Sequence, residues 1–140
     1  MSKVLASAAA FMAFGFAAAA GAAPVVPPAY ATAYVALKGD VARGKVVFTQ
    51  CKTCHVVTPG VNRIGPSLYG VVGRPSGSIA GYAYSAANKN SHITWTEPVM
   101  FTYLEAPQKF LPGTKMSYAG LKDPQKRADV IAYLKSKPTA

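Results

Sequence analysis

Apolar residues recur at helical spacing in three stretches of this chain, each of which follows a residue that favours a helix N-terminus. The first follows Asp40 and runs to about Gln50, and the second follows Thr96. The third begins at Asp123-Pro124, where a capping carboxylate precedes a proline of the first turn, and it ends near Ser136. The apolar positions of the three faces are Val41, Val46, Val47 and Phe48; Val99, Met100, Tyr103 and Leu104; and Val130, Ile131, Tyr133 and Leu134. The pattern predicts three amphipathic helices.

The rest of the chain carries shorter or irregular patterns. Ser85 to Asn90 predicts one short helix, and Ala106 to Phe110 predicts a turn or short helix that ends at Leu111-Pro112-Gly113. Residues 56–84 are rich in Gly, Pro and Ser and predict a loop that is unusually long for a compact domain. Because no β-hairpin signal and no internal repeat stand out, we predict an all-α fold with substantial loops.

The first 38 residues differ from the rest in composition. Lys3 precedes an uncharged stretch rich in Ala and Phe, and small residues follow at positions 20–23, which is typical of a secretory signal peptide. We expect residues 1–23 to be removed, residues 24–38 with their three prolines to form an N-terminal extension or linker, and residues 39–140 to form the domain. The alternative is a retained membrane anchor, for which the stretch is slightly short and only weakly hydrophobic.

The chain is strongly basic, with 15 Lys and Arg against 5 Asp and Glu among 140 residues and a net charge of +10. The basic residues are scattered, and no nucleic-acid-binding motif appears, so we predict no nucleic-acid partner. The charge indicates either a solvated basic surface or electrostatic steering toward acidic protein partners.

The strongest chemical signal is the run Cys51-Lys52-Thr53-Cys54-His55. C-x-x-C-H is the pattern of covalent c-type haem attachment. Two thiols three positions apart face one side of a helical turn, so both can add to the vinyl groups on one edge of a haem. His55 follows directly and can bind the iron. A haem would also give the long 56–84 loop a surface on which to pack.

Three other interpretations of these cysteines are weaker. A thioredoxin-like redox pair would need a βαβ context, which the sequence lacks. A structural zinc site needs four Cys or His ligands, and the only further candidate is His92. Two inert cysteines would leave the position of His55 unexplained.

The second axial position of the iron needs another donor, and the candidates are Met100, Met116, His92 and several lysines. Met100 lies on the apolar face of a predicted helix, and His92 is expected in a surface loop. Met116 lies in residues 111–120, which turn-forming residues bound, and can present a thioether. We therefore favour Met116 from its position in this loop. His/Met ligation would raise the reduction potential, and a filled site would suppress oxygen chemistry.

From residue 39 to about residue 137 the chain resembles class I c-type cytochromes, specifically the mitochondrial cytochrome c and bacterial cytochrome c2 group. The stretches that carry the resemblance are Cys51-Lys52-Thr53-Cys54-His55, Ile64-Gly65-Pro66-Ser67-Leu68, Ala87-Asn88-Lys89-Asn90 with Ile93-Thr94-Trp95, Pro112-Gly113-Thr114-Lys115-Met116 and Ile131-Ala132-Tyr133-Leu134-Lys135. This ordered set is far more specific than the C-x-x-C-H motif alone.

The resemblance implies the small cytochrome c fold, in which N- and C-terminal helices pack together and loops wrap round one covalent haem c. It implies that Cys51 and Cys54 attach the haem, that His55 and Met116 are the axial ligands, and that the Pro66 carbonyl accepts the His55 ring N–H. The other residues that it places round the haem are Arg74, Tyr84 and Trp95 at a propionate and Asn88, Tyr103 and Thr114 on the Met side. It also places Gly44 and Tyr133 where the terminal helices meet.

Two departures concern the surface near the haem. Gln108 replaces one of two adjacent lysines, which we expect to weaken one partner contact, and Tyr118 stands where mitochondrial proteins carry Phe. Neither departure bears on the fold.

The resemblance implies a soluble periplasmic one-electron carrier, not an enzyme. Its expected partners are acidic surfaces of a cytochrome bc1 complex and of cytochrome c oxidase or a photosynthetic reaction centre. We expect Lys52, Lys89, Lys109 and Lys115 to surround the exposed haem edge, and a monomer without stable membrane insertion after signal cleavage. A haem peroxidase, a nitrite reductase or a small-ligand sensor would need an open iron site, against which Met116 argues.

Overall fold

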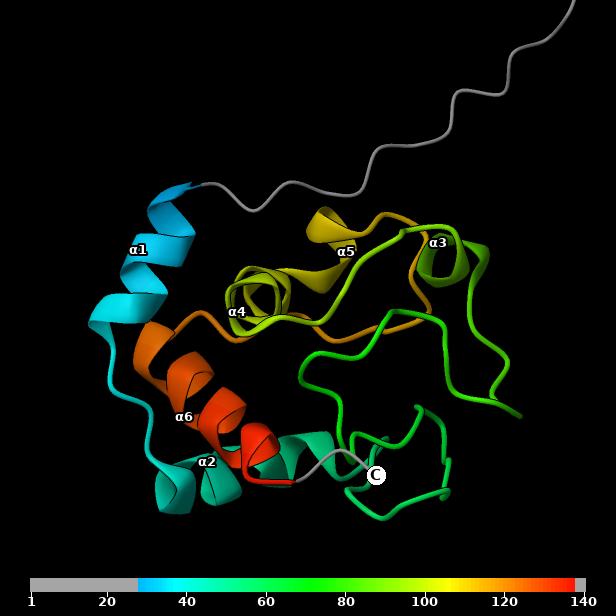
Figure 1. Ribbon diagram of the computed structural model, residues 1–140, viewed down its shortest axis with the longest axis horizontal. Coiled ribbons are helices and arrows are strands. Elements are labelled where there is room, and N and C mark those ends of the chain that lie inside the picture. Colours follow the sequence, from blue (N-terminus) through cyan, green and yellow to red (C-terminus); the bar gives the residue numbers. More distant parts are fainter. Residues whose placement is uncertain (1–27, 138–140) are drawn as a thin grey trace, which may run out of the picture.

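The computed structural model describes residues 28–137 as helices joined by long loops (Figure 1). The helices are α1 (Pro28–Ala36), α2 (Val41–Val47), η1 (Phe48–Cys51), α3 (Ala86–Lys89), α4 (Glu97–Glu105), α5 (Pro107–Phe110) and α6 (Pro124–Lys135). Extended pairing among the described residues is limited to an isolated bridge between Pro75 and Thr94. The predicted all-α fold with substantial loops is confirmed.

The first predicted helix begins as expected and ends earlier. The Asp40 side chain accepts a hydrogen bond from a backbone N–H of the first turn of α2, as its capping role requires. The α-helix stops at Val47, short of the predicted end at Gln50, and continues as the 3₁₀ helix η1. Tightening of the last turn is common at helix C-termini. The combined segment brings Cys51 to the end of a helix whose position is set by α6.

The core forms where α2 and η1 cross α6 (Figure 1). Gly44 is buried at the crossing, and a Cβ built there would lie 2.6 Å from the carbonyl carbon of Asp129 and 2.8 Å from the Tyr133 Cβ. No side chain larger than hydrogen fits between the two backbones. Next to this contact the Phe48 and Tyr133 rings pack with their centroids 5.2 Å apart. The expected packing of the terminal helices is therefore present, and Gly44 permits it.

A polar cluster around Asp129, the Asp129 cluster, lies beside the same crossing and consists of Asp129, Arg43, Gln125 and the backbone N–H of Asp40. The Arg43 guanidinium donates to both carboxylate oxygens of Asp129, at 2.8 and 2.9 Å. Asp129 also accepts from the backbone N–H of Asp40 at 2.8 Å and from the Gln125 amide at 2.9 Å. The Asp129 carboxylate is buried, and these donors offset the cost of removing it from water.

The α4 helix packs against α6 and separates two apolar clusters. Met100 is 5% exposed and Phe101 is 1% exposed, so the expectation that Met100 belongs to the core is confirmed. The larger cluster contains Phe48, Val71, Met100, Phe101, Val130, Ile131, Tyr133 and Leu134. The smaller one contains Ile93, Tyr103 and Leu111, with Trp95 and Met116 packed on it. The smaller cluster connects the core to the predicted haem site.

The segment before α2 differs from the predicted linker, because α1 packs on the domain. The ring centroids of Tyr34 in α1 and Phe101 in α4 lie 5.5 Å apart, so the two helices are in contact. The Tyr34 hydroxyl donates to Glu97, and Glu97 also accepts a hydrogen bond from Lys135 of α6 at 2.7 Å. Pro28 is tolerated because it is the first residue of the helix, where the N–H that proline lacks would have no partner.

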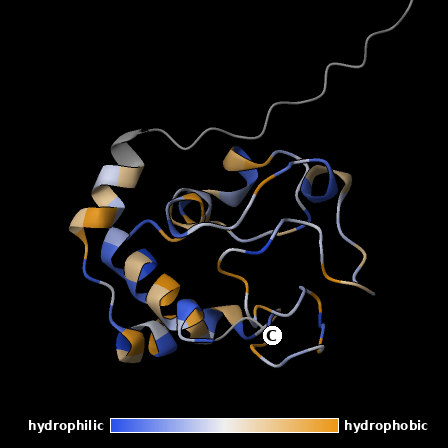
Figure 2. Cartoon of the chain, viewed as in Figure 1, coloured by the Kyte–Doolittle hydropathy of each residue, from blue (hydrophilic) through white to orange (hydrophobic). Residues whose placement is uncertain are grey.

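Figure 2 shows polar and apolar residues mixed along α2 and α6. Between residues 28 and 137 no helix is long and apolar enough to cross a membrane. The predicted signal peptide, residues 1–23, and the part of the 24–38 segment that precedes Pro28 lie outside the described residues.

The Asp129 cluster predicts a specific pH dependence of stability. The Arg43 guanidinium is the main reason that the pKa of Asp129 lies at about 2, below its ordinary 3.8. Because the folded pKa is the lower one, the carboxylate stabilises the fold fully above about pH 4, and this stabilisation is lost as the pH falls toward 2. We expect the unfolding free energy of Asp129→Asn to change less steeply over this range than that of the wild type. Denaturant titrations across the pH series measure both slopes, and equal slopes would contradict the assignment.

Candidate haem site

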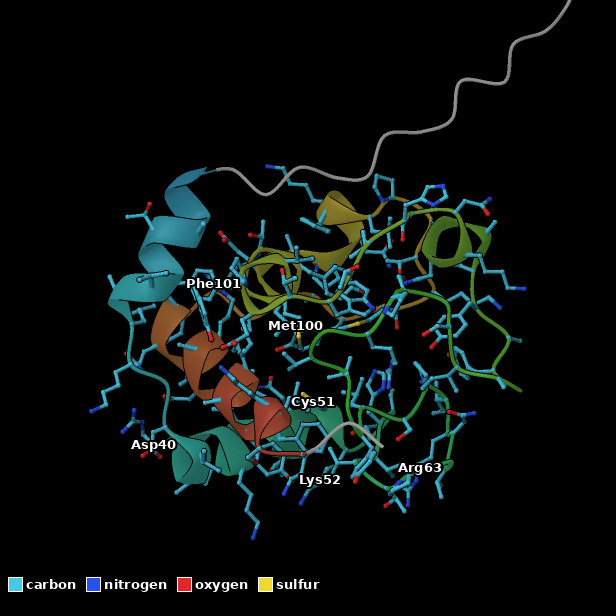
Figure 3. All side chains as sticks on the ribbon, viewed as in Figure 1. Asp40, Cys51, Lys52, Arg63, Met100 and Phe101 are labelled. Carbon is cyan, nitrogen blue, oxygen red and sulfur yellow. The ribbon has the colours of Figure 1, made fainter. Side chains whose placement is uncertain are left out.

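The motif begins at Cys51, the last residue of η1, and continues as one turn through Cys54 to His55. The N–H groups of Cys54 and His55 both donate to the Cys51 carbonyl, at 3.1 and 2.9 Å, so the helical path continues through the motif. Both thiols are free and half-buried. Lys52, which lies below Cys51 in Figure 3, is exposed. The turn therefore presents the cysteines inward while the residue after Cys51 stays exposed.

The surroundings of the cysteines do not favour a redox pair or a structural zinc site. Burial, and then the nearby Cys54, raise the pKa of the Cys51 thiol to about 11. A redox dithiol needs a lowered pKa on the attacking thiol, and here the shift has the opposite sign. Among residues 28–137 no three His, Cys, Asp or Glu side chains gather into a group that could hold a metal ion, so a structural zinc site has too few ligands.

His55 is held in a single orientation by the loop that follows it. Its Nδ1 lies 2.8 Å from the Pro66 carbonyl, which can only accept, so Nδ1 carries the proton and Nε2 keeps a free lone pair. Burial lowers the pKa of His55, and the Pro66 hydrogen bond opposes this only partly, so the ring stays neutral. A Cβ built on Gly65 would lie 2.6 Å from Nδ1 and 2.7 Å from Nε2, so only glycine lets the chain approach the ring this closely. Neutral imidazole with one nitrogen fixed is the form in which histidine binds metals.

The chain after the motif folds back on it and so places Pro66. The Gly65 N–H donates to the Cys54 carbonyl at 2.8 Å, and the Leu68 N–H donates to the Val56 carbonyl at 2.8 Å. These bonds fix both sides of Pro66 against the cysteine turn. The first part of the long 56–84 loop is therefore ordered by hydrogen bonds to the motif itself.

The structure also brings together the residues predicted to surround Met116. The Tyr103 hydroxyl donates to the Met116 sulfur at 3.2 Å, and the Thr114 hydroxyl donates to the Asn88 side chain at 3.1 Å. Burial raises the pKa of Tyr103, and a hydrogen bond with Thr114 opposes the shift. The Met116 side chain is half-buried against the cluster of Ile93, Tyr103 and Leu111. The network orients the thioether and leaves it a lone pair for a metal.

The three residues predicted at a haem propionate are brought together in part. The backbone N–H of Trp95 donates to the Arg74 carbonyl at 2.9 Å. Burial lowers the pKa of Arg74, and the nearby Tyr84 opposes this shift. The Arg74 guanidinium donates to the carbonyls of Ser67 at 2.9 Å and Tyr69 at 2.8 Å. A cavity of about 510 Å³ lies beside it, lined by Pro59, Gly60, Ser67, Tyr69, Gly70, Gly73, Arg74, Ile79 and Ala80. None of the four residues predicted to attach the haem or bind its iron, Cys51, Cys54, His55 and Met116, lines this cavity.

Sequence reasoning missed three contacts around the site. The Gln108 amide donates to two carbonyls of the segment that carries Met116. The Tyr118 hydroxyl donates to Gln50 at 2.8 Å, and the Tyr82 hydroxyl donates to the Ile64 carbonyl at 2.7 Å. The Tyr82 and Tyr118 bonds join residues 18 and 68 positions apart, the Gln108 bonds join residues six and eight positions apart, and none has a motif spacing. In the sequence, the only indication of these contacts was that Gln108 and Tyr118 depart from the family pattern.

Comparisons with known proteins agree with this geometry. The family model for cytochrome c matches residues 41–138. A cytochrome c2 of Rhodopila globiformis is 59% identical over 99 residues, which are 70% of this chain and 93% of that protein. A cytochrome c of Nigella damascena is 50% identical over 99 residues, covering 69% of this chain and 89% of that protein.

The fold is shared as well as the sequence. The solved structure of cytochrome cH from Methylobacterium extorquens superposes with a TM-score of 0.67 at 46% identity, and the match covers 71% of this chain and 100% of that one. The turn that presents Cys51, Cys54 and His55 lies inside the region matched by the family model. The chain therefore belongs to the cytochrome c family, the class I c-type cytochromes, whose members carry one covalent haem c and transfer electrons instead of catalysing a reaction.

Proposed function

We propose that the chain carries single electrons through one haem that Cys51 and Cys54 attach and that His55 and Met116 bind from opposite sides. One observation carries the proposal: each ligand has a dedicated partner that leaves one lone pair free. The Pro66 carbonyl accepts from His55 Nδ1 at 2.8 Å, and the Tyr103 hydroxyl donates to the Met116 sulfur at 3.2 Å. The donor set fits a six-coordinate haem iron.

The surrounding residues suit a carrier because they keep the site unchanged between oxidation states. When bound, the haem supplies an iron that alternates between Fe(III) and Fe(II). The chain fixes both ligands through hydrogen bonds and excludes water with apolar side chains, so little has to move when the charge changes. Asn88 and Thr114 pair with each other near Met116, and Arg74, Tyr84 and Trp95 supply donors suited to a propionate carboxylate.

The electron partners that we propose are acidic surfaces on a cytochrome bc1 complex and on cytochrome c oxidase or a photosynthetic reaction centre. The net charge of +10 supports this, and Lys52, Lys89, Lys109 and Lys115 are all exposed. Contacts of this kind are small and brief, and opposite charges accelerate their formation. We propose that the protein makes these contacts as a monomer and that it has no nucleic-acid partner.

We further propose export to the periplasm, with residues 1–23 as the signal peptide and residues 39–140 as the cytochrome domain. The composition of the first 23 residues supports this, and a retained membrane anchor is the alternative. The packing of α1 on α4 extends the folded unit to Pro28, beyond the proposed domain boundary.

Binding of carbon monoxide separates a carrier from a haem enzyme or a ligand sensor. If Met116 fills the sixth site, the reduced haem protein should form little carbon monoxide complex at a gas concentration that saturates an open haem. Met116→Ala should bind carbon monoxide readily, because it removes the thioether. Optical titration of both proteins measures this. Tight binding by the wild type, equal to that of the variant, would exclude the closed carrier site.

The basic surface predicts a steep salt dependence of electron transfer. The second-order rate constant with cytochrome c oxidase should fall at least about tenfold between low salt and about 1 M salt, where the Debye length shrinks to about 3 Å. The double variant Lys52→Gln/Lys109→Gln should be slower at low salt and equal to wild type at high salt. Lys38→Gln is the control, since Lys38 is exposed on the connection between α1 and α2 and is not among the lysines expected around the haem edge. Stopped-flow kinetics that show a flat salt response would refute the steering role.

A further inference from the structure

The loop that carries Met116, residues 111–120, is bound on its α5 side by one uncharged side chain. Gln108 lies in α5, and its Nε2 donates to the Met116 carbonyl at 2.6 Å and to the Thr114 carbonyl at 3.1 Å. Both partners can only accept, so the nitrogen of the amide must face the loop. One planar NH₂ group therefore connects α5 to two backbone carbonyls, one of which belongs to Met116 itself.

The loop has few other backbone restraints. The Thr114 N–H donates to the Leu111 carbonyl at 3.1 Å, and the next backbone–backbone bond along the described chain is Leu121 N–H to the Leu104 carbonyl at 2.7 Å. Between these points the Met116 N–H reaches only the Thr114 hydroxyl, at 3.4 Å. The backbone on both sides of the thioether thus lacks the repeated hydrogen bonds that hold a helix, and the two Gln108 bonds stabilise it at its centre.

The other side-chain bonds to the loop act elsewhere. Lys115 donates to the Ala83 carbonyl at 2.9 Å and so ties the loop to the preceding loop, and the Tyr118 hydroxyl donates to Gln50 of η1 at 2.8 Å. Tyr103 and Thr114 act through side chains. Gln108 is distinct because it binds the backbone carbonyls of Thr114 and Met116, the residues on either side of Lys115. Its amide is also neutral at every pH, so its hold on the loop does not change with protonation.

We propose that Gln108 is the positioning residue that keeps the Met116 loop closed, acting through the Thr114 and Met116 carbonyls. The inference rests on the proposed role of Met116 as an iron ligand. Opening of the loop then withdraws the thioether and lets an outside ligand reach the iron. Gln108 sets how rarely this happens, without touching the haem ligands' side chains.

The test compares Gln108→Ala and Gln108→Glu with wild type in the haem-loaded protein. Alanine removes both donors, and glutamate keeps the shape but offers no N–H and faces two carbonyl oxygens. Lys109→Ala is the matched control, because Lys109 is the exposed neighbour on the same short helix. Two quantities are measured: the amide hydrogen-exchange rate of residues 111–120, and the affinity of the ferric protein for imidazole, which competes with Met116.

Both Gln108 variants should exchange the loop amides about three- to tenfold faster and bind imidazole about three- to tenfold more tightly. Tenfold corresponds to about 1.4 kcal/mol. Exchange in α2 and α6 should stay unchanged, and Lys109→Ala should match the wild type. Loop exchange and imidazole affinity within twofold of wild type in both Gln108 variants would overturn the proposal.

Failure of the underlying ligand assignment has a separate signature. If Met116 is not a ligand, Met116→Ala leaves imidazole affinity unchanged, because nothing competes for the iron. Faster loop exchange in the Gln108 variants would still support the clamp in that case. If Met116→Ala does raise the affinity while the Gln108 variants speed exchange without raising it, the link between loop closure and ligation is wrong.

Discussion

The close crossing of α2 and α6 at Gly44 is the contact on which the rest of the structure depends. The two backbones approach so closely that a Cβ at position 44 would lie 2.8 Å from that of Tyr133. The contact fixes the direction of α2, and η1 continues it to Cys51 without an intervening loop. The attachment site is therefore placed by helix packing, with Phe48 buried against Tyr133 on one side and the Asp129 cluster closing the other.

The two proposed iron ligands reach the site by different means. His55 follows the packed helix directly and is oriented by Pro66, which the returning chain brings to the ring. Met116 lies in a loop with little backbone bonding, so side chains from α4, α5 and the loop itself must position it. The His55 side of the site is held by helix packing, and the Met116 side is held by individual side-chain hydrogen bonds. A carrier needs both sides filled, and the second side is where opening can occur.

Local signals predicted much of this from the sequence. Asp40 and Asp123 cap helices where a carboxylate stands before an apolar repeat, and the cysteine spacing identifies the attachment turn. The α1 helix could not be predicted because its stability comes from Phe101 and Glu97, more than sixty residues away, while its prolines indicated a linker. The Gln108 clamp was missed for a different reason: its partners are only six and eight residues away, but an exposed glutamine has no pattern until the loop it binds is in place.

The most direct test of this account is X-ray absorption at the iron edge of the oxidised, haem-loaded protein. The account predicts one sulfur neighbour and five nitrogen neighbours for the wild type, and loss of the sulfur in Met116→Ala but not in Met100→Leu, because Met100 is a core residue. An iron shell of nitrogen and oxygen alone in the wild type, or a sulfur that persists in Met116→Ala, would contradict the closed His55–Met116 site.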